Sequence, residues 1–191
     1  LTTIEKWAFN GFQKLTSLKI PASVTHISEE FIWGAFQLDT ITVDENNEYY
    51  TDVDGVLFDK EMKTLITYPT GKSETKYIIP NGVEKICNYA FYENQKLESV
   101  EFSDSIVDIG DWAFYSCVKL SEVVLNDGIK NIGIDAFNDC VYLKKINLPD
   151  GLLTIGDAAF ARCESLSPSM IIPDTVTSIG KCAFGECRGL I

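Results

Sequence analysis

The sequence is poor in the residues on which many catalytic and membrane functions depend. It has one histidine, two methionines and six prolines in 191 residues, and 16 basic residues stand against 28 acidic ones. With His26 as the only histidine, a serine triad of the usual kind is not expected. No pair of carboxylates stands out among the acidic residues. We therefore expect no enzyme activity and no catalytic residue.

The charge balance and the lack of long apolar runs argue against two classes of partner. A formal net charge of −12 repels a phosphate backbone, so nucleic acid is not expected to bind. No apolar run approaches the roughly 18–20 residues that a membrane span needs, so we expect no direct insertion into a membrane. The first residues, Leu1 to Trp7, lack the basic-then-apolar layout of a signal peptide.

The sequence does contain an internal repeat of about 23 residues. The pair Ala-Phe recurs at steps of 23, 23, 23 and 24 residues, with an Ile four residues before each Ala. A Cys or Asn stands three positions after each of the five Phe residues, and an aliphatic-x-aliphatic run comes later in the repeat. One such coil is too small to bury its own apolar face, whereas stacked coils bury a continuous core, so the period indicates a solenoid. The pairs are Ala90-Phe91, Ala113-Phe114, Ala136-Phe137, Ala159-Phe160 and Ala183-Phe184.

The repeat reaches the N-terminus when Phe31-Ile32, and not Ala35-Phe36, takes the Ala-Phe position. Aligning Leu38 with Leu15 restores the step of 23 and puts Ala35 in the cysteine position. We expect the aliphatic runs to form a parallel sheet of short strands about 4.8 Å apart, with a single helical turn at each Ala-Phe pair opposite. The coils, numbered 1 to 8 below, open at Leu1, Val24, Asn47, Val83, Ile106, Ile129, Leu152 and Val176.

Coil 3 is longer than the others, and its excess is typical of a β-hairpin. The step from Asn47 to Val83 is 36 residues, which is one coil of 23 plus 13. Two β-rich runs, 54–58 and 64–69, flank the polar link 59–63, as in a hairpin insertion.

Coil 7 carries one extra residue, which we assign to Ser167-Pro168-Ser169. Proline cannot donate to a sheet ladder, so a small bulge is expected there.

Four of the six cysteines occupy one repeat position and predict a ladder of small buried groups. Rungs about 4.8 Å apart approach disulfide distance, but parallel side chains are badly aimed for a bond. No C-x-x-C pair exists, so neither a zinc site nor any other metal or cofactor is expected. The ladder residues are Cys117, Cys140, Cys163 and Cys187, whereas Cys87 and Cys182 lie outside it and could be thiols or disulfides.

Two further motifs have simpler structural interpretations. The segment 52–55 with Glu61 is similar to a calcium loop, but Tyr50 would stand at the first ligand position, so a solvated turn is favoured. The segment 71–73 is similar to a phosphate loop, but Ile66 stands where its leading glycine is required.

An aromatic residue often precedes the Ala-Phe pair. Trp7 and Trp112 occupy this position, which Tyr89, Asp135, Ala158 and Cys182 also take. Such a tolerant position suggests a partly exposed shoulder. Its aromatic side chains could anchor a partner or pack across adjacent turns, and the sequence leaves both open.

The repeat resembles the BspA-type leucine-rich repeats of bacterial and protozoan surface proteins. The matching residues are the frame 155–166 and the irregular coil with Asn47-Glu48-Tyr49-Tyr50, 54–58 and 65–69. The resemblance implies a leucine-rich-repeat solenoid of about seven to eight 23-residue coils, as a single domain over 1–191 with the hairpin insertion near 47–82. Because neither end shows a polar capping unit, we expect a piece of a longer protein.

The resemblance also implies an extracellular or cell-surface location and an adhesin-like, protein-binding role. We expect the partner to be a protein, such as one of a host extracellular matrix, or a glycan. The alternative is a structural spacer or stalk that displays another domain. Binding specificity should come from variable strand positions and insertions, because stacking constrains the core positions. The candidate docking residues are Val56, Phe58 and Tyr68 on the hairpin, with Thr42, Ile78 and Glu101 on the adjoining strand column.

Overall fold

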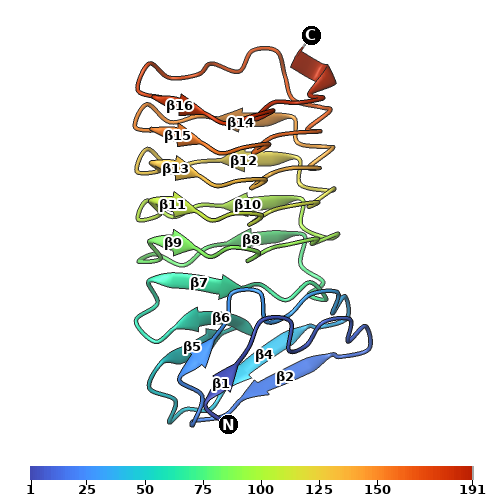
Figure 1. Cartoon of the computed structure of the whole chain (residues 1–191), viewed down its shortest axis with the longest axis vertical. Coiled ribbons are helices and arrows are strands. Elements are labelled where there is room, and N and C mark those ends of the chain that lie inside the picture. Colours follow the sequence, from blue (N-terminus) through green and yellow to red (C-terminus); the bar gives the residue numbers. More distant parts are fainter. Residues whose placement is uncertain (191) are drawn as a thin grey trace.

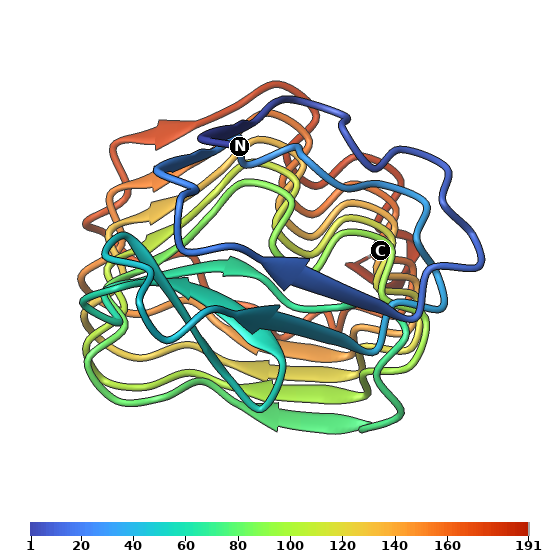
Figure 2. The same cartoon turned by 90° about the horizontal axis from the view of Figure 1, so that it is seen from below.

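The chain forms a stack of coils that wind around one long axis, with the N-terminus and the C-terminus at opposite ends (Figure 1). The computed structural model describes residues 1–190. Each regular coil contributes one short strand to each of two sheet columns and a run of turns between them. Seen along the axis, the coils drawn in green to red follow similar outlines, whereas the blue and teal N-terminal part departs from them (Figure 2). The predicted solenoid with parallel short strands is confirmed.

The first sheet column contains the strand that leads into each Ala-Phe turn. Its parallel register joins Ile109 to Ile132 and Ile132 to Ile155, so the 23-residue period is the backbone step from one rung to the next. Its strands outside coil 3 are β1 (Thr3–Ile4) and β3 (His26–Ile27), which pair with each other in a separate sheet, then β9 (Lys85–Ile86), β11 (Asp108–Ile109), β13 (Asn131–Ile132), β15 (Thr154–Ile155) and β16 (Ser178–Ile179).

The second column is divided into two sheets. In the three strands of its upper part that follow the first, the central residue is buried, as Val123 is between Glu122 and Val124, because neighbouring side chains of a strand point to opposite faces. The lower sheet contains β2 (Ser17–Ile20) and β4 (Thr40–Val43), and the upper one contains β8 (Lys76–Ile78), β10 (Ser99–Glu101), β12 (Glu122–Val124) and β14 (Lys145–Asn147).

The Ala-Phe segments are turns and not the helical turns expected from the sequence. The backbone N–H of Phe91 donates to the carbonyl of Ala113 in the next coil (2.7 Å), whereas that of Tyr92 donates to Tyr89 three residues back (3.1 Å). Tyr89 has φ 61° and Trp112 has φ 52°, in the left-handed region, which interrupts any helix. Alternate N–H groups thus donate hydrogen bonds to the neighbouring coil, and this extends the hydrogen bonding between coils into the turns. The described chain has one 3-10 helix, η1 (Arg188–Leu190).

The core consists of ladders of like side chains. Phe137 stacks on Phe114 with centroids 5.0 Å apart and on Phe160 at 5.3 Å, with the rings tilted by 2° and 3°. The thiol of Cys140 donates to the carbonyl of Phe114 (3.2 Å), and the other ladder thiols repeat this contact. All six cysteines lie in the described chain and are free thiols. The ladder predicted from the sequence is confirmed.

Coil 3 contains the predicted hairpin, with one strand more than expected. The strands β5 (Tyr50–Val53), β6 (Val56–Asp59) and β7 (Thr64–Thr67) pair antiparallel in that order, and β7 pairs parallel with β9. The hairpin is therefore a part of the first sheet column, between the lower coils and the regular stack (Figure 1).

The alignment chosen for coil 2 is also confirmed. Phe31 is fully buried, and its carbonyl accepts the N–H of Phe9 (2.9 Å), as Ala113 accepts that of Phe91. Ala35 is buried in the cysteine position, whereas Phe36 is exposed. The pair Ala35-Phe36 is a coincidence of sequence. Among the described residues, no helix is long and apolar enough to cross a bilayer.

Candidate functional site

Three of the predicted docking residues are in the core. Val56 and Phe58 are 0% exposed and Tyr68 is 1% exposed, so none of them can contact a partner while the chain is folded. The prediction that these residues are available to a partner is wrong, because β6 lies between β5 and β7 in the sheet and its residues Val56, Leu57 and Phe58 are all buried. The hairpin fills the interior of an irregular coil, which explains its apolar composition.

The other three predicted residues are exposed, but the structure brings only two of them together. Ile78 and Glu101 are neighbours in register on β8 and β10. Thr42 is on β4, in the separate lower sheet. The same register continues from Glu101 to Val124 and from Val124 to Asn147. The exposed strand column therefore runs upward from the hairpin, away from Thr42.

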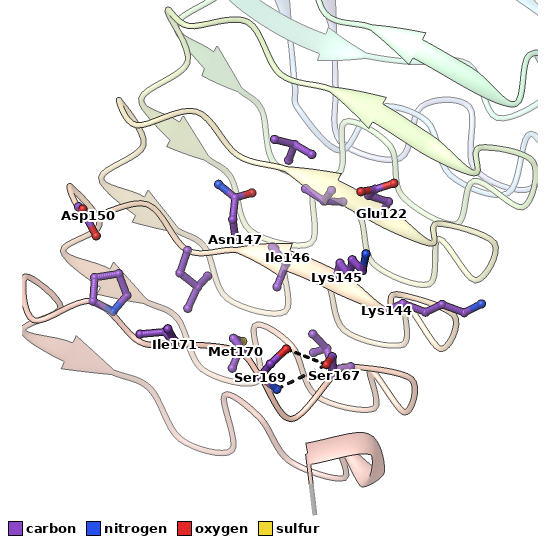
Figure 3. A pocket seen from close by; sticks show the side chains of 15 residues that line it. Glu122, Lys144, Lys145, Ile146, Asn147, Asp150, Ser167, Ser169, Met170 and Ile171 are labelled. Atoms are coloured by element: carbon purple, nitrogen blue, oxygen red, sulfur yellow. Dashed lines mark hydrogen bonds between the residues drawn. The ribbon is translucent and has the colours of Figure 1, made fainter.

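The upper end of this column opens into a groove of about 560 Å³. One wall is β12 and β14, and the other is the segment 166–173 of coil 7 (Figure 3). Apolar side chains of Val124, Met170 and Ile171 line it, and Ile171 is 79% exposed. Charged groups stand among the lining residues, namely Glu122, Lys144, Lys145 and Asp150.

The groove exists because coil 7 leaves the sheet. Pro168 has no N–H for the ladder, and the hydroxyls of Ser167 and Ser169 bond to each other (2.9 Å), which closes a local turn. No strand forms in the described chain between β15 and β16, although the sequence Met170-Ile171-Ile172 has the apolar character of one. The predicted bulge is thus a full displacement of the strand.

This displacement leaves one edge of β14 open. β14 pairs with β12 and with no other strand within residues 1–190. The amide of Asn147 donates to the carbonyl of Leu125 and accepts its N–H, both at 2.9 Å, which fixes the side that faces β12. The opposite edge of β14 lines the groove. A free strand edge presents unpaired N–H and C=O groups, which another extended segment can use.

The acidic and lysine motifs of coil 3 have structural roles. Asp52 accepts the N–H of Val43 (2.6 Å), which holds the hairpin to β4. The ammonium of Lys72 is directed to the carbonyl of Asp54 (2.8 Å) and not to an open loop. No group of three or more His, Cys, Asp or Glu residues in the part of the chain described by the structure is arranged to hold a metal ion.

The thiols are placed too deeply for ready reaction, with one exception. Burial raises the pKa of Cys117 to about 12 and the pKa values of Cys140 and Cys163 well above the usual range for a thiol. Cys87 is buried beside Glu29, with Sγ 3.3 Å from a carboxylate oxygen. Cys182 is exposed.

Of the groove residues, sequence reasoning singled out only Ser167 and Ser169, as the place of the extra residue in coil 7. The available signal was the extra residue beside Pro168, which marks the coil that breaks the stack. That signal gives the position of the irregularity but not its size.

Solved structures of bacterial leucine-rich-repeat proteins are similar to this chain. A leucine-rich cell-surface protein from Faecalibacterium prausnitzii A2-165 has 38% identity and a TM-score of 0.91, over 100% of this chain and 50% of that one. A leucine-rich-repeat protein from Eubacterium ventriosum ATCC 27560 has 25% identity and a TM-score of 0.64, over 90% and 58%. The pneumococcal vaccine antigen PcpA has 29% identity and a TM-score of 0.67, over 100% and 41%. The chain spans about half the length of the first of these relatives.

The family comparison agrees with these structures. No curated protein sequence matches the chain. The family described as "BspA type Leucine rich repeat region" matches residues 1–60 and 68–191, in six copies. The interval between the two matches falls in the hairpin of coil 3, where the repeat frame is interrupted. With its 23-residue frame, its parallel strand columns and this match, the chain belongs to the BspA-type leucine-rich repeat family.

Proposed function

We propose that this chain is an adhesin-like binding module of an extracellular surface protein, which holds an extended segment of a partner protein along the upper strand column. The open edge of β14 beside the groove carries this proposal. Strand addition at a free edge supplies main-chain hydrogen bonds, and pockets for alternate side chains supply specificity. A matrix protein of a host is the partner class that fits an extracellular module of this family.

The surface around the edge supports binding more than a purely structural role. Ile78 is 67% exposed and Val124 is 58% exposed, in one register with the groove residue Asn147. Exposed apolar groups in contiguous patches are typical of interaction surfaces. A stalk without a ligand would need only a solvated outer face.

The test is binding of immobilised extracellular-matrix proteins by the chain, measured by surface plasmon resonance. The variant Val124→Lys/Ile171→Lys changes two exposed groove residues, so its melting temperature should stay near that of the wild type. We expect this variant to lose at least tenfold in affinity for a bound protein. The matched control is Leu153→Lys, an exposed apolar residue outside the groove, which should bind normally.

Equal binding by the groove variant and the control would exclude the groove as the site. Binding of isolated matrix glycans in place of the proteins would indicate a glycan-binding module. If no member of the panel binds, the stalk is the better interpretation. Shortening the hairpin is not a suitable test, because the carbonyl of Lys63 accepts the N–H groups of Glu84 (2.7 Å) and Lys85 (3.1 Å) from the regular stack.

A further inference from the structure

An aromatic recess lies on the turn side of the molecule, between coil 2 and coil 4. Its volume is about 210 Å³, and it is distinct from the groove beside β14. Four aromatic side chains line it, from coils that are far apart in sequence. They are Trp7, Trp33, Tyr89 and Tyr92, with the polar residues Lys6 and Glu30 beside them.

The recess lies beside coil 3, whose turn is shorter than that of coil 4. Backbone pairing equates Leu65 with Ile86, and the bond from the N–H of Tyr68 to Ala90 (2.8 Å) equates Tyr68 with Phe91. Leu65 to Tyr68 is three residues, whereas Ile86 to Phe91 is five. The shoulder of the turn is therefore two residues shorter in coil 3, and within residues 1–190 that coil has no counterpart of Tyr89. Because coil 3 has no side chain at this position, the aromatic side chains of the coils on either side of it are exposed.

The upper wall of the recess is held rigidly by stacking. Tyr89 stacks on Trp112 with centroids 5.1 Å apart and an angle of 26°, and Tyr92 stacks on Tyr115 at 5.1 Å and 9°. Tyr89 and Tyr92 also contact each other at 5.4 Å. A wall of this kind keeps its ring faces in place without a ligand, which lowers the entropy cost of binding.

The lower wall stands across from these rings. Trp33 meets Tyr92 edge to face, with centroids 6.4 Å apart, and its indole N–H donates to a carboxylate oxygen of Glu93 (3.3 Å). Trp7 is 56% exposed. All three tryptophans of the chain are thus in the recess or stacked against its wall.

The electrostatic surroundings of the recess favour a cation. Burial, assisted by the negative charges of Glu30, Asp111 and Asp135, raises the pKa of Tyr89 to about 12. The ammonium of Lys6 already lies 4.6 Å from the Trp7 centroid and 2.5 Å from Glu30. Aromatic faces attract cations through their negative quadrupole. The contact made by Lys6 shows that this wall accepts a cationic group.

We propose that the recess binds arginine guanidinium groups of a basic polypeptide partner. A guanidinium is planar and weakly hydrated, so it stacks on an aromatic face while its N–H groups remain free for a carboxylate such as Glu30. The net charge of −12 attracts a basic chain and repels acidic ones. In the bound state the arginine takes the place of Lys6 between Trp7 and Glu30.

The experiment titrates the whole chain with an octapeptide of alternating Gly and Arg. Tryptophan fluorescence is the readout, because two of the three tryptophans line the recess and the third stacks on its wall, and calorimetry supplies a second one. Three variants are compared with the wild type, namely Trp33→Leu, Glu30→Gln and Lys6→Ala. The matched control is Tyr142→Leu, an aromatic residue 59% exposed that does not line the recess. Melting temperatures check that each variant is folded.

We expect Trp33→Leu to weaken binding of the peptide at least tenfold and Glu30→Gln to weaken it several-fold. Lys6→Ala should strengthen binding several-fold, since it frees both the Trp7 face and Glu30, and misfolding cannot produce such a gain. The control should bind like the wild type. A variant altered in the groove beside β14 should also bind like the wild type, which separates this site from the proposed function.

Four results would overturn the proposal. They are no saturable binding of the Gly-Arg peptide, equal affinity of the wild type and Trp33→Leu, unchanged or weaker binding by Lys6→Ala, and equally tight binding of a Gly-Lys octapeptide. Exposed aromatic side chains can also bind carbohydrate, and the same titration with a neutral oligosaccharide tests this alternative. Binding of that sugar, lost in Trp33→Leu, without binding of the Gly-Arg peptide would show a carbohydrate site instead.

Discussion

Coils 4 to 6 and coils 1 to 3 come from one repeat but pack differently. In the upper coils the phenylalanine rings are nearly parallel, as for Phe114 and Phe137 at 2°. In the lower coils Phe9 meets Phe31 edge to face, at 90°, and Tyr68 stands in the phenylalanine position of coil 3. The two candidate binding surfaces lie where the regular stack is interrupted, at coil 3 and at coil 7. Regularity provides the core, and departures from it provide surfaces that differ from coil to coil.

The largest expected effect is on the phenylalanine ladder. Phe137→Ala removes a fully buried ring that stacks on two others, so unfolding should be easier by about 3–5 kcal/mol. Phe9→Ala removes a half-buried ring from the lower coils and should cost roughly 1–2 kcal/mol. Urea unfolding measures both. Equal losses at the two positions would remove the contrast between the halves.

The cysteine ladder predicts that alkaline pH destabilises the upper coils. An unfolded thiol ionises near pH 8.5, whereas burial holds the pKa of Cys117 at about 12 in the folded chain. The folded state therefore binds more protons between these values, and stability falls as the pH rises from about 9 to 12. By pH 11 Cys117 should contribute about 3 kcal/mol of this loss, and the other ladder thiols act in the same direction.

The measurement is urea unfolding at pH 7 and pH 11, for the wild type and for Cys117→Ala. The variant should lose less stability between the two pH values. Coil 2 carries Ala35 in the same position and contributes nothing to the effect. With a thiol reagent at neutral pH, Cys182 should react first and the ladder thiols only on unfolding. An unchanged pH dependence in Cys117→Ala would contradict the assignment.

Tyr68 offers a test in the opposite direction. Its hydroxyl is buried and has no hydrogen-bond partner in the described chain. An unpaired buried hydroxyl is unfavourable, and coil 4 has Phe91 at this position, so Tyr68→Phe should stabilise the protein by about 1 kcal/mol. Thermal unfolding would show a higher midpoint. A clear loss of stability would mean that the Tyr68 hydroxyl makes a hydrogen bond in the folded protein.

The smallest effect distinguishes a turn from a helix in the upper coils. Ala158 has φ 52°, so Ala158→Gly should be neutral or stabilising by less than about 1 kcal/mol. Its neighbour Ala159 is fully buried with φ outside that region, and Ala159→Gly should destabilise by roughly 1 kcal/mol. In a helical turn both changes would be unfavourable. Chemical unfolding of the pair decides between the two.

The periodic part of the fold could be predicted from the sequence, because residues at the same repeat position have the same surroundings in a stack of coils. One step of 23 placed Phe31 in the core and Ala35 in the cysteine position. The turn conformation was not predictable in this way. Short apolar segments fit a helical turn equally well, and the left-handed residues at this shoulder include Trp7 and Ala158, which carry no glycine signal.

The docking residues were harder to predict for a physical reason. Apolar residues in an insertion can form a surface or fill a gap, and composition alone does not distinguish these outcomes for Val56 and Phe58. Exposed register positions such as Ile78 follow from strand alternation and were predicted correctly as exposed. The groove and the recess depend on how two coils fail to superpose, which is a property of pairs of coils and not of one sequence window.

Coil 5 separates the two candidate binding surfaces. The upper wall of the recess belongs to coil 4 and the open edge of β14 to coil 6, two rungs away, or about 10 Å along the axis. Duplication of one 23-residue unit in the gene would add about 4.8 Å without changing a residue of either surface. A bivalent partner is held best when its span matches the distance between sites. If both proposals hold, the number of repeat copies sets the distance between the two sites, and with it the length of a partner that can occupy both.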